Sequence, residues 1–507
     1  MSANTANKRI AKNTIILYIR EIASLLIALY SSRILLQQLG VNDFGLYGLI
    51  GSILMLFNSL RGLFASSIQR FINVEKGLGN ESNVNKVFSL GVTIHIGLSV
   101  VFFIVSEIAG LILIPTLNIP VESMTAAQWV LQFSIFASVV TIMTVPYDAL
   151  IIANEKFDAL AVLSITESVL KLLAVLLLVF SPIVKVVAYS ALIFIVSLIV
   201  RAANAIYCSH KFKDEAKFRF TKDKAYLKEM TVFAGWHFLG NTIYAVVNAG
   251  MNFVINIFGG VVVNAARNVA YQVLNAVQKF VTSVNLSFQP QSMMLYSQGN
   301  KDKYNAIMFI NTKVSVAVSA ILGFVVTVMS PSLLRLWLGD VPNHSIEFVQ
   351  AIFLYAVIRS MHSPVDTMFK AAGKLKKYQM LETSVQILNI PFSLLLLYVG
   401  MPYYSIFISM SVVEIVNLFA VLRLAKAQLC FNTSHYTKNV MTRIFLLIAA
   451  LGVTFAFLVD ILNEGYSLLF TLLKSFACFL LAALLTIPIL FSIDELKKVF
   501  FIKNKKH

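Results

Sequence analysis

Polar side chains recur at helical spacing inside one apolar segment near the N-terminus. In the stretch NSLRGLFASSIQR, Asn58, Arg61 and Gln69 stand at i, i+3 and i+11, which places them on one face of a helix. A central arginine in hydrocarbon costs at least about 2.5–3.5 kcal/mol, so this face should contact protein or water. Because the arginine fork matches phosphate oxygens, Arg61 is a candidate for binding an anion.

Three further segments carry polar stripes of the same kind. Their members are Arg20, Ser24, Ala28 and Ser31 in the first, His237, Asn241, Tyr244, Asn248 and Asn252 in the second, and Asn275, Gln278, Lys279, Thr282, Asn285 and Gln289 in the third. Four facing stripes would form a polar cleft between helices. The stripe of His237, Asn241 and Asn248 could instead only hold helices together through hydrogen bonds.

Four cations within apolar segments are candidates to bind an anion, namely Arg20, Arg61, Lys279 and Arg359. Arg20 stands beside Glu21, so it could simply pair with an acid on a neighbouring helix. Lys279 and Arg359 could extend to the membrane interface or pair internally. Arg61 has no acid within one turn of its own helix, which favours the ligand-binding interpretation for this residue.

A candidate site for a coupling ion lies near two prolines. His362 and Asp366 follow Arg359 on one helical face, and Asp148 follows Pro146 as Asp366 follows Pro364. Proline frees backbone carbonyls, and a carboxylate beside them could bind a proton or a sodium ion. The structural alternative is that each proline ends or kinks its helix and each aspartate binds freed backbone.

The composition indicates the elements that must position these residues. Of the 507 residues, 58% are hydrophobic and only 13% are charged, against about 25% charged in soluble proteins. A bilayer span needs roughly 20 apolar residues. Fourteen such segments are present, at 13–36, 43–68, 87–114, 126–150, 157–180, 183–207, 229–257, 262–289, 307–337, 346–369, 378–399, 402–424, 440–461 and 466–491. We therefore predict an all-α polytopic membrane protein.

Charge placement orients the predicted helices. The breaks after even-numbered segments hold most of the lysines and arginines, including a dense run from Lys211 to Lys228, whereas the breaks after odd-numbered segments hold only Lys185. The positive-inside rule then predicts that both termini are cytoplasmic. The net charge of +17 is explained by topology and anionic lipid headgroups, and nucleic-acid binding is not expected.

Several classes of protein are disfavoured. Cys208, Cys430 and Cys478 are far apart, which indicates neither a disulfide framework nor a metal site. The sequence has no Walker loop, dinucleotide fingerprint or HExxH pair, and no loop is long enough for a soluble catalytic domain. We therefore expect no enzyme activity, catalytic residue, cofactor or metal.

The chain repeats itself at an offset of 220 residues. Ser67 and Gln69 fall on Ser287 and Gln289, and several glycines and asparagines coincide in the same way. The offset spans six segments, an even number, so both copies have one orientation in the membrane. This predicts two six-helix bundles related by a pseudo-two-fold axis along the membrane normal, with two extra C-terminal helices. Arg61 has no counterpart, because Val281 takes its position.

The predicted domains follow from this repeat. They are an N-terminal six-helix bundle at 1–207, a basic cytoplasmic linker at 208–228, a second six-helix bundle at 229–425, and two additional helices with a basic tail at 426–507. Parallel repeats of this kind usually serve alternating access, with the substrate site at the interface of the bundles.

Two stretches resemble a known family. SSRILLQQLGVNDFGLYGLIGSI, Ser31 to Ile53, is similar to the start of the polysaccharide transporters, the Wzx-type lipid-linked oligosaccharide or O-antigen flippases. NAARNVAYQVLNAVQKFVTSVNLSFQPQSMMLYSQGN, Asn264 to Asn300, looks like the matching signature of the second bundle. The superfamily also includes lipid II flippases, whose second-span signature is absent here, and multidrug and toxin extrusion antiporters, which commonly have twelve spans.

The resemblance implies a flippase that moves a polyprenyl-pyrophosphate-linked oligosaccharide to the outer leaflet of the bacterial inner membrane by alternating access. The glycan would be an O-antigen, lipopolysaccharide, capsule or exopolysaccharide repeat unit. Membrane lipids, a polysaccharide polymerase and chain-length machinery are the expected partners. Transport could be coupled to protons or sodium ions, or uncoupled, and the sequence leaves these alternatives open. The stripe residues His237, Asn241, Asn248, Gln69 and Gln289 would then bind sugars, and the four cations would bind pyrophosphate.

Two other functions remain open from the sequence. A multidrug or organic-cation antiporter should have a cleft dominated by acidic residues, whereas this one is richer in arginine and lysine. A membrane-embedded polysaccharide polymerase or ligase should have a large outer loop with catalytic residues, which this sequence lacks.

Overall fold

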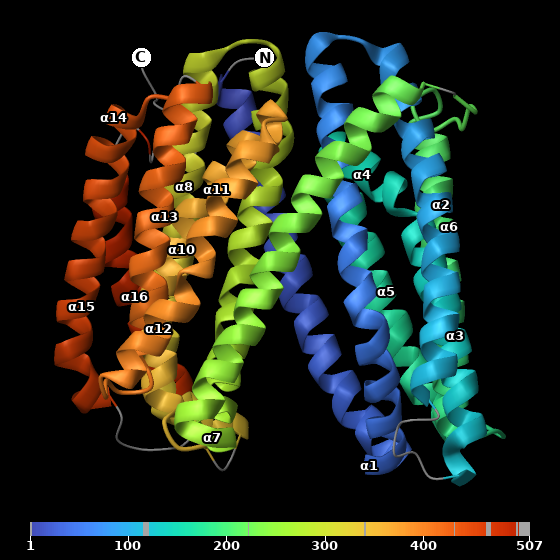
Figure 1. Ribbon diagram of the computed structural model, residues 1–507, viewed down its shortest axis with the longest axis horizontal. Helices are drawn as coiled ribbons and strands as arrows, with labels where there is room; N and C mark the ends of the chain where they lie inside the picture. The colour runs from blue at the N-terminus through green and yellow to red at the C-terminus, as the bar shows by residue number, and fades with distance from the viewer. Residues whose placement is uncertain are drawn as a thin grey trace. The chain divides into compact units, whose positions relative to one another are not determined.

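The computed structural model describes residues 3–114, 121–221, 223–338, 341–429, 431–462, 468–492 and 495 (Figure 1). Every regular element among these residues is a helix. Contacts divide the chain into two units, which are described separately. We call Ile15–Gly235 the N-terminal unit, and Met1–Thr14 together with Trp236–His507 the C-terminal unit.

The helices of the N-terminal unit follow the chain in order. They are most of α1 (Ala3–Leu78), α2 (Glu81–Leu113), α3 (Met124–Met143), α4 (Val145–Ala153), α5 (Phe157–Leu177), α6 (Lys185–Lys211) and the first residues of α7 (Lys224–Ser297). Short 3-10 turns precede α3 and follow α5. A core of Ile50, Phe102, Val130 and Ile135, with similar apolar neighbours, packs between them.

The C-terminal unit contains the rest of α7 and the remaining helices. These are α8 (Lys301–Val328), α9 (Ser330–Leu338), α10 (Ser345–Ala372), α11 (Leu375–Ile387), α12 (Asn389–Tyr398), α13 (Ser405–Leu429), α14 (Thr433–Tyr436), a π-helical turn (Thr437–Met441), α15 (Thr442–Leu462) and α16 (Leu468–Leu490). Its core includes Met251, Ile255, Phe348, Ile352 and Phe407.

All fourteen predicted segments coincide with helices, which confirms the all-α polytopic fold. Nine helices among the described residues are long and apolar enough to cross a membrane. Three predicted segments are each broken into two helices, at Thr144, Met329 and Leu388. Four others are joined in pairs, because α1 and α7 each run through two predicted segments.

Both long helices fold back on themselves, as the two arms of each show in Figure 1. In α1 the break falls at Gly40, whose φ of 76° and ψ of 173° suit glycine and strain other residues. In α7, Arg267 donates a hydrogen bond to Asn252, 15 residues earlier. A straight helix would separate these two residues by about 22 Å, so the chain must reverse between them.

Each unit includes the first residues of the helix that leads into the other unit. Thr14 Oγ1 lies 2.8 Å from Ser287 Oγ in the C-terminal unit, and Ser67 Oγ donates to the Met230 carbonyl at 3.1 Å in the N-terminal unit. Ser67 and Ser287 are the repeat-related serines of the sequence. The two bounds, after Thr14 and after Gly235, are themselves 221 residues apart.

The basic segment after α6 is bound to the N-terminal unit by its few acids. Glu215 accepts from Lys76 at 2.8 Å, and Asp223 pairs with Lys86 at 2.6 Å. The hydrogen bond from Lys86, aided by the backbone N–H of Tyr226, lowers the pKa of Asp223. The domain bounds 1–207, 208–228, 229–425 and 426–507 remain our proposal.

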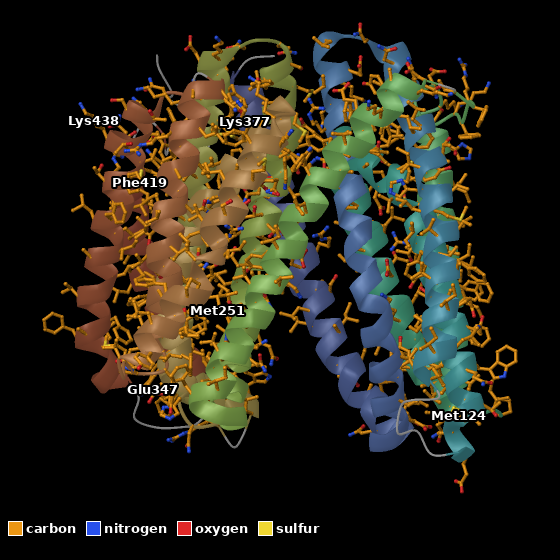
Figure 2. All side chains as sticks on the ribbon, viewed as in Figure 1. Met124, Met251, Glu347, Lys377, Phe419 and Lys438 are labelled. Carbon is orange, nitrogen blue, oxygen red and sulfur yellow. The ribbon has the colours of Figure 1, made fainter. Side chains whose placement is uncertain are left out.

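The two ends of the C-terminal unit differ in charge. Lys377 and Lys438 lie toward one end and Glu347 toward the other, with Met251 between them (Figure 2). This distribution agrees with the basic breaks after even-numbered segments in the sequence.

Candidate functional site

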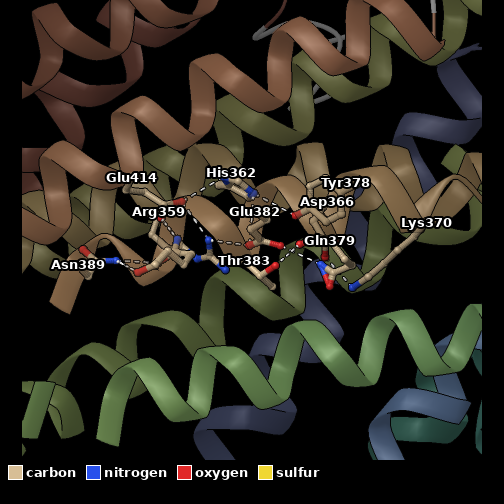
Figure 3. A network of polar contacts seen from close by, with 11 residues as sticks. Arg359, His362, Asp366, Lys370, Tyr378, Gln379, Glu382, Thr383, Asn389 and Glu414 are labelled. Atoms are coloured by element: carbon tan, nitrogen blue, oxygen red, sulfur yellow. Dashed lines mark hydrogen bonds and ion pairs between the residues drawn. The ribbon is translucent and has the colours of Figure 1, made fainter. Parts of the chain in front are cut away.

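A network of charged side chains lies inside the C-terminal unit, where α10, α11 and α13 pack together (Figure 3). Helix α10 presents Arg359, His362 and Asp366 at i, i+3 and i+7. Helix α11 contributes Glu382 and α13 contributes Glu414. Ionisable side chains among apolar helices require partners or water, so their arrangement decides what the site can bind.

Arg359 lies between two carboxylates. Its Nη1 is 3.0 Å from Oε1 of Glu414 and 3.3 Å from Oε1 of Glu382. The Glu414 side chain is only 1% exposed. A buried charge of this kind is stable only when it is paired and hydrogen-bonded, so Arg359 is engaged by the protein itself.

His362 lies between the same two carboxylates. Its Nδ1 is 3.1 Å from Oε1 of Glu414, its Nε2 is 3.0 Å from the Tyr378 hydroxyl, and Nε2 is 3.6 Å from Oε1 of Glu382. With a neutral imidazole, the group of Arg359, His362, Glu382 and Glu414 has a net charge of −1; with an imidazolium it is neutral. One proton therefore decides the charge of this group.

Amide side chains hold the second oxygen of each carboxylate. Gln386 Nε2 donates to Oε2 of Glu414 at 2.6 Å, and Gln379 Nε2 donates to Oε2 of Glu382 at 2.9 Å. Gln386 is oriented in turn by Asn389, whose Nδ2 donates to its Oε1 at 2.9 Å. These bonds fix the carboxylates toward Arg359.

A cavity of about 290 Å³ opens beside this network between α7, α10 and α11. Its lining residues are Gly240, Ile243, Tyr244, Leu274, Asn275, Gln278, Tyr355, Arg359, Asp366, Lys370, Gln379, Glu382, Thr383 and Gln386. Lys370 pairs with Asp366 at 2.6 Å, and the Arg359 guanidinium lies 5.8 Å from the centre of the Tyr244 ring. The cavity is thus polar, with each lining cation beside a carboxylate.

The structure brings only some of the sequence candidates into this site. Arg359 and Asp366 line the cavity, and His362 contacts the lining residue Glu382 without lining the cavity itself. Lys279, on the same helix as the lining residues Asn275 and Gln278, is exposed and does not line it.

The remaining candidates lie elsewhere or outside the described part of the chain. Asn248 receives a hydrogen bond from Arg267 at 3.4 Å, Gln289 is partly buried, and Gln69 is buried in the N-terminal unit. Arg20 bonds to the adjacent Glu21 of its own helix, and not to an acid on a neighbouring helix. The side chains of Arg61, His237 and Asn241 are outside the described residues.

Asp148 belongs to a second ionic cluster, in the N-terminal unit. Asn204 donates to it at 2.5 Å, and Arg201 lies 3.5 Å from it and 2.7 Å from Glu167. Glu167 also pairs with Lys171 at 2.8 Å. Asp148 is thus held by side chains of α6.

Comparisons with known proteins place this architecture in a family. The model of the polysaccharide biosynthesis protein family matches residues 10–291, more than half of the chain. The chain belongs to this family. No curated protein matches it significantly.

Several solved structures have the same fold as this chain. A crystal structure of a MATE point mutant has a TM-score of 0.74 at 14% identity, covering 84% of this chain and 97% of the other. An outward-facing MATE-family transporter of the MOP superfamily gives 0.73 at 13%, with the same coverage. A MOP-superfamily transporter from Pyrococcus furiosus, described as having a binding pocket of reverse polarity, gives 0.72 at 12%, again with 84% and 97% covered. This polysaccharide biosynthesis protein therefore has the MATE-like fold of that superfamily.

Sequence reasoning missed three ionisable residues that the structure of this family member makes prominent. Glu382 and Glu414 are lone acids in the apolar segments 378–399 and 402–424, and a lone intramembrane acid is itself a signal of function. Arg267 is 2% exposed and lies 4.2 Å from the centre of the Tyr271 ring. Its hydrogen bonds go to asparagines of the other arm of α7.

Proposed function

We propose that this protein is a flippase for a polyprenyl-pyrophosphate-linked oligosaccharide. It would move the repeat unit of an O-antigen, capsule or exopolysaccharide from the inner to the outer leaflet of a bacterial inner membrane by alternating access. Both termini would be cytoplasmic, and polysaccharide polymerase and chain-length machinery would act on the product.

One observation carries this proposal: a polysaccharide biosynthesis protein with a MATE-like fold holds a polar cavity among its apolar helices. Burying amides and charges there costs free energy that a purely structural bundle would avoid. Amide, hydroxyl and carboxylate groups together match the many donors and acceptors of a glycan.

The pyrophosphate needs cations, and a cation already held between two carboxylates is poorly suited to bind it, whereas Arg20 contacts one carboxylate, that of Glu21. We assign this role to Arg61, Arg20 and Lys279, and assign sugar contacts to the polar stripe of His237, Asn241, Asn248, Gln69 and Gln289. Arg359 differs from the other three cations, because two carboxylates already surround it.

Ion coupling is a further part of the proposal. His362, which contacts both carboxylates, would take part in binding the coupling ion, together with Asp366 four residues further along α10. Asp148, which contacts Asn204 and Arg201, would bind a coupling ion in the N-terminal unit. Transport in vesicles that carry either a proton gradient or a sodium gradient tests this assignment.

The alternative, an antiporter of drugs or organic cations, needs carboxylates available to a cationic ligand. The carboxylates that line the cavity, Asp366 and Glu382, each lie within 3.3 Å of a lysine or arginine nitrogen. The pairing favours the flippase over this alternative, and a drug-accumulation assay separates the two.

Reconstitution tests the flippase directly. Proteoliposomes with a fluorescent lipid-linked oligosaccharide should show leaflet exchange, which a membrane-impermeant quencher reports. We expect Arg61→Ala to abolish exchange and Arg61→Lys to retain part of it, because lysine keeps the charge without the fork. Wild-type protein that leaves the lipid in one leaflet would refute the proposed function, and normal exchange by Arg61→Ala would refute the site assignment.

A further inference from the structure

The charges that line the cavity of the C-terminal unit balance one another. Arg359 lies 3.3 Å from Glu382, and Lys370 lies 2.6 Å from Asp366. Glu414 adds a second carboxylate 3.0 Å from Arg359. A pyrophosphate in this cavity would approach these carboxylates as closely as it approaches Arg359, which also lines the cavity. Bringing like charges together without solvent is unfavourable, so this is a poor anion site.

The other polar groups of the lining are neutral. Asn275, Gln278, Gln379 and Gln386 carry amides, and Thr383 carries a hydroxyl. Each of these side chains contains both a donor and an acceptor, of which Gln379 and Gln386 already use one N–H on Glu382 and Glu414, and Thr383 its O–H on the Gln379 carbonyl. A sugar hydroxyl also donates and accepts, so the lining is complementary to a ring that carries several hydroxyls.

The volume limits what the cavity can hold. Pockets for drug-sized ligands typically occupy roughly 300–1,000 Å³. At about 290 Å³ this cavity is at the lower limit of that range, so it can enclose a sugar ring but not a whole oligosaccharide, the rest of which would extend out of it. Tyr244, an exposed aromatic side chain on α7, offers a flat apolar surface for the C–H face of such a ring.

One glycine shapes the lining. A Cβ atom at Gly240 would lie 1.8 Å from Oε1 of Gln379, which is far too close. The absence of a side chain at Gly240 thus lets Gln379 stand where its Nε2 bonds to Glu382 at 2.9 Å. An added methyl group would push this amide aside and change the polar lining, while the rest of α7 could remain as it is.

We propose that this cavity is a subsite for one uncharged sugar ring of the glycan, and that Arg359 orders its carboxylates instead of binding the pyrophosphate. Glu382 and the lining amides would bind the hydroxyls, and Tyr244 would pack against the ring. This assignment rests on the proposed function and adds to it that the two ends of the substrate are recognised at different places.

Binding by the purified full chain in detergent tests the assignment. The probes are glucose, galactose, mannose, N-acetylglucosamine and inorganic pyrophosphate, each titrated while thermal unfolding is followed. We expect the wild type to bind at least one of the sugars, and Gly240→Ala to weaken that binding about tenfold. Gly235→Ala is the matched control, because a Cβ there on the same helix meets nothing within 4 Å. Asn275→Ala, at an exposed lining position, should weaken sugar binding without affecting folding.

Pyrophosphate provides the opposing measurement. Its effect on unfolding should be the same for wild type and for the Gly240→Ala and Asn275→Ala variants. The assignment is overturned if the wild type binds none of the four sugars, if both variants bind sugar like the wild type, or if they lose an effect of pyrophosphate. The proteoliposome assay on the same preparation separates the two proposals, since leaflet exchange without sugar binding removes only the subsite.

Discussion

A single buried carboxylate connects three helices of the C-terminal unit. Glu414 on α13 accepts from Arg359 on α10 through one oxygen and from Gln386 on α11 through the other. Its side chain is 1% exposed, so water cannot replace a lost partner. The stability of the site therefore depends on the exact complement of charges around this residue.

Neutralising Glu414 should destabilise the protein more than neutralising Glu382. Glu414→Gln removes the fully buried carboxylate, leaves Arg359 with one carboxylate, and should cost about 3–5 kcal/mol. Glu382→Gln should cost less, because the Glu382 side chain is 12% exposed and water can compensate. Thermal unfolding in detergent gives both values. Equal losses for the two variants would contradict this ranking.

The residues of this site were only partly predictable. The helical spacing of Arg359, His362 and Asp366 follows from the sequence alone, since it depends on one helix. Glu382 and Glu414 reach Arg359 because particular faces of α10, α11 and α13 pack together. The spacing of residues within one helix does not indicate which faces of different helices meet. Lys279 shows the same limit, because its helix turns it away from the cavity.

At the scale of elements, the turn inside α1 depends on backbone conformation. Gly40 and Gly97 both have open space where a Cβ would stand, but only Gly40 has a positive φ. All fourteen segments were predictable from apolar runs, which are local. The joining of two segments into α1 was not, because it depends on the φ and ψ of one glycine.

This pair of glycines gives a controlled comparison. Gly40→Ala should lower the free energy of unfolding by about 1–3 kcal/mol, since alanine is strained at that conformation. Gly97→Ala, inside α2, should raise it by up to about 1 kcal/mol, because alanine favours helix. Chemical denaturation followed by circular dichroism distinguishes the two signs. A stabilising Gly40→Ala would contradict the assigned turn.

An ion pair attaches Glu495, which follows α16 in the sequence, to α8. Glu495 lies 2.7 Å from the buried Lys313 and 3.8 Å from Arg443. Burial opposes ionisation of Glu495, but hydrogen bonds from Lys313 and from the backbone N–H of Ser492 hold its pKa below the usual value of 4.5. The ionised form is therefore favoured in the folded state, and its stabilisation is fully present above pH 4.5.

The difference in stability between wild type and Glu495→Gln should decrease as the pH falls. At pH 7 the wild type should be more stable by about 1–3 kcal/mol. The difference should shrink as the pH falls below 4.5 and through the lowered pKa, where Glu495 becomes protonated. Melting temperatures of both proteins between pH 7 and pH 3 measure it. A difference that stays constant over this range would contradict the ion pair.

At the scale of the whole molecule, the segment after α6 is a strap that is bound to the N-terminal unit, and it is not a flexible linker. Besides Glu215 and Asp223, backbone groups attach it: Asn85 Nδ2 donates to the Lys217 carbonyl at 2.6 Å, and the Arg219 N–H donates to Ser89 at 3.0 Å. The basic composition of this segment predicted only a linker. Its few acids are outnumbered by lysines, so the sequence did not indicate that they bind the rest of the unit.

Removing the two acids should expose this strap to protease. Glu215→Gln combined with Asp223→Asn retains every trypsin site but breaks the contacts with Lys76 and Lys86. We expect cleavage after Lys213, Lys217 or Arg219 to become roughly five- to tenfold faster, since proteolysis follows the population of the opened segment. Asp214→Asn, at an exposed neighbouring acid, is the control and should cleave like the wild type. Unchanged cleavage of the double variant would contradict the bound strap.

The helices that the two units share also have a consequence for the order of synthesis. Residues 3–14 emerge first, yet their unit includes Ser287, which is made about 270 residues later. The N-terminal unit likewise lacks Met230 until α7 has begun to emerge. The N-terminal unit is complete once Gly235 has been made, whereas residues 3–14 must wait for Ser287. The first segment to leave the ribosome is therefore among the last to find its final place.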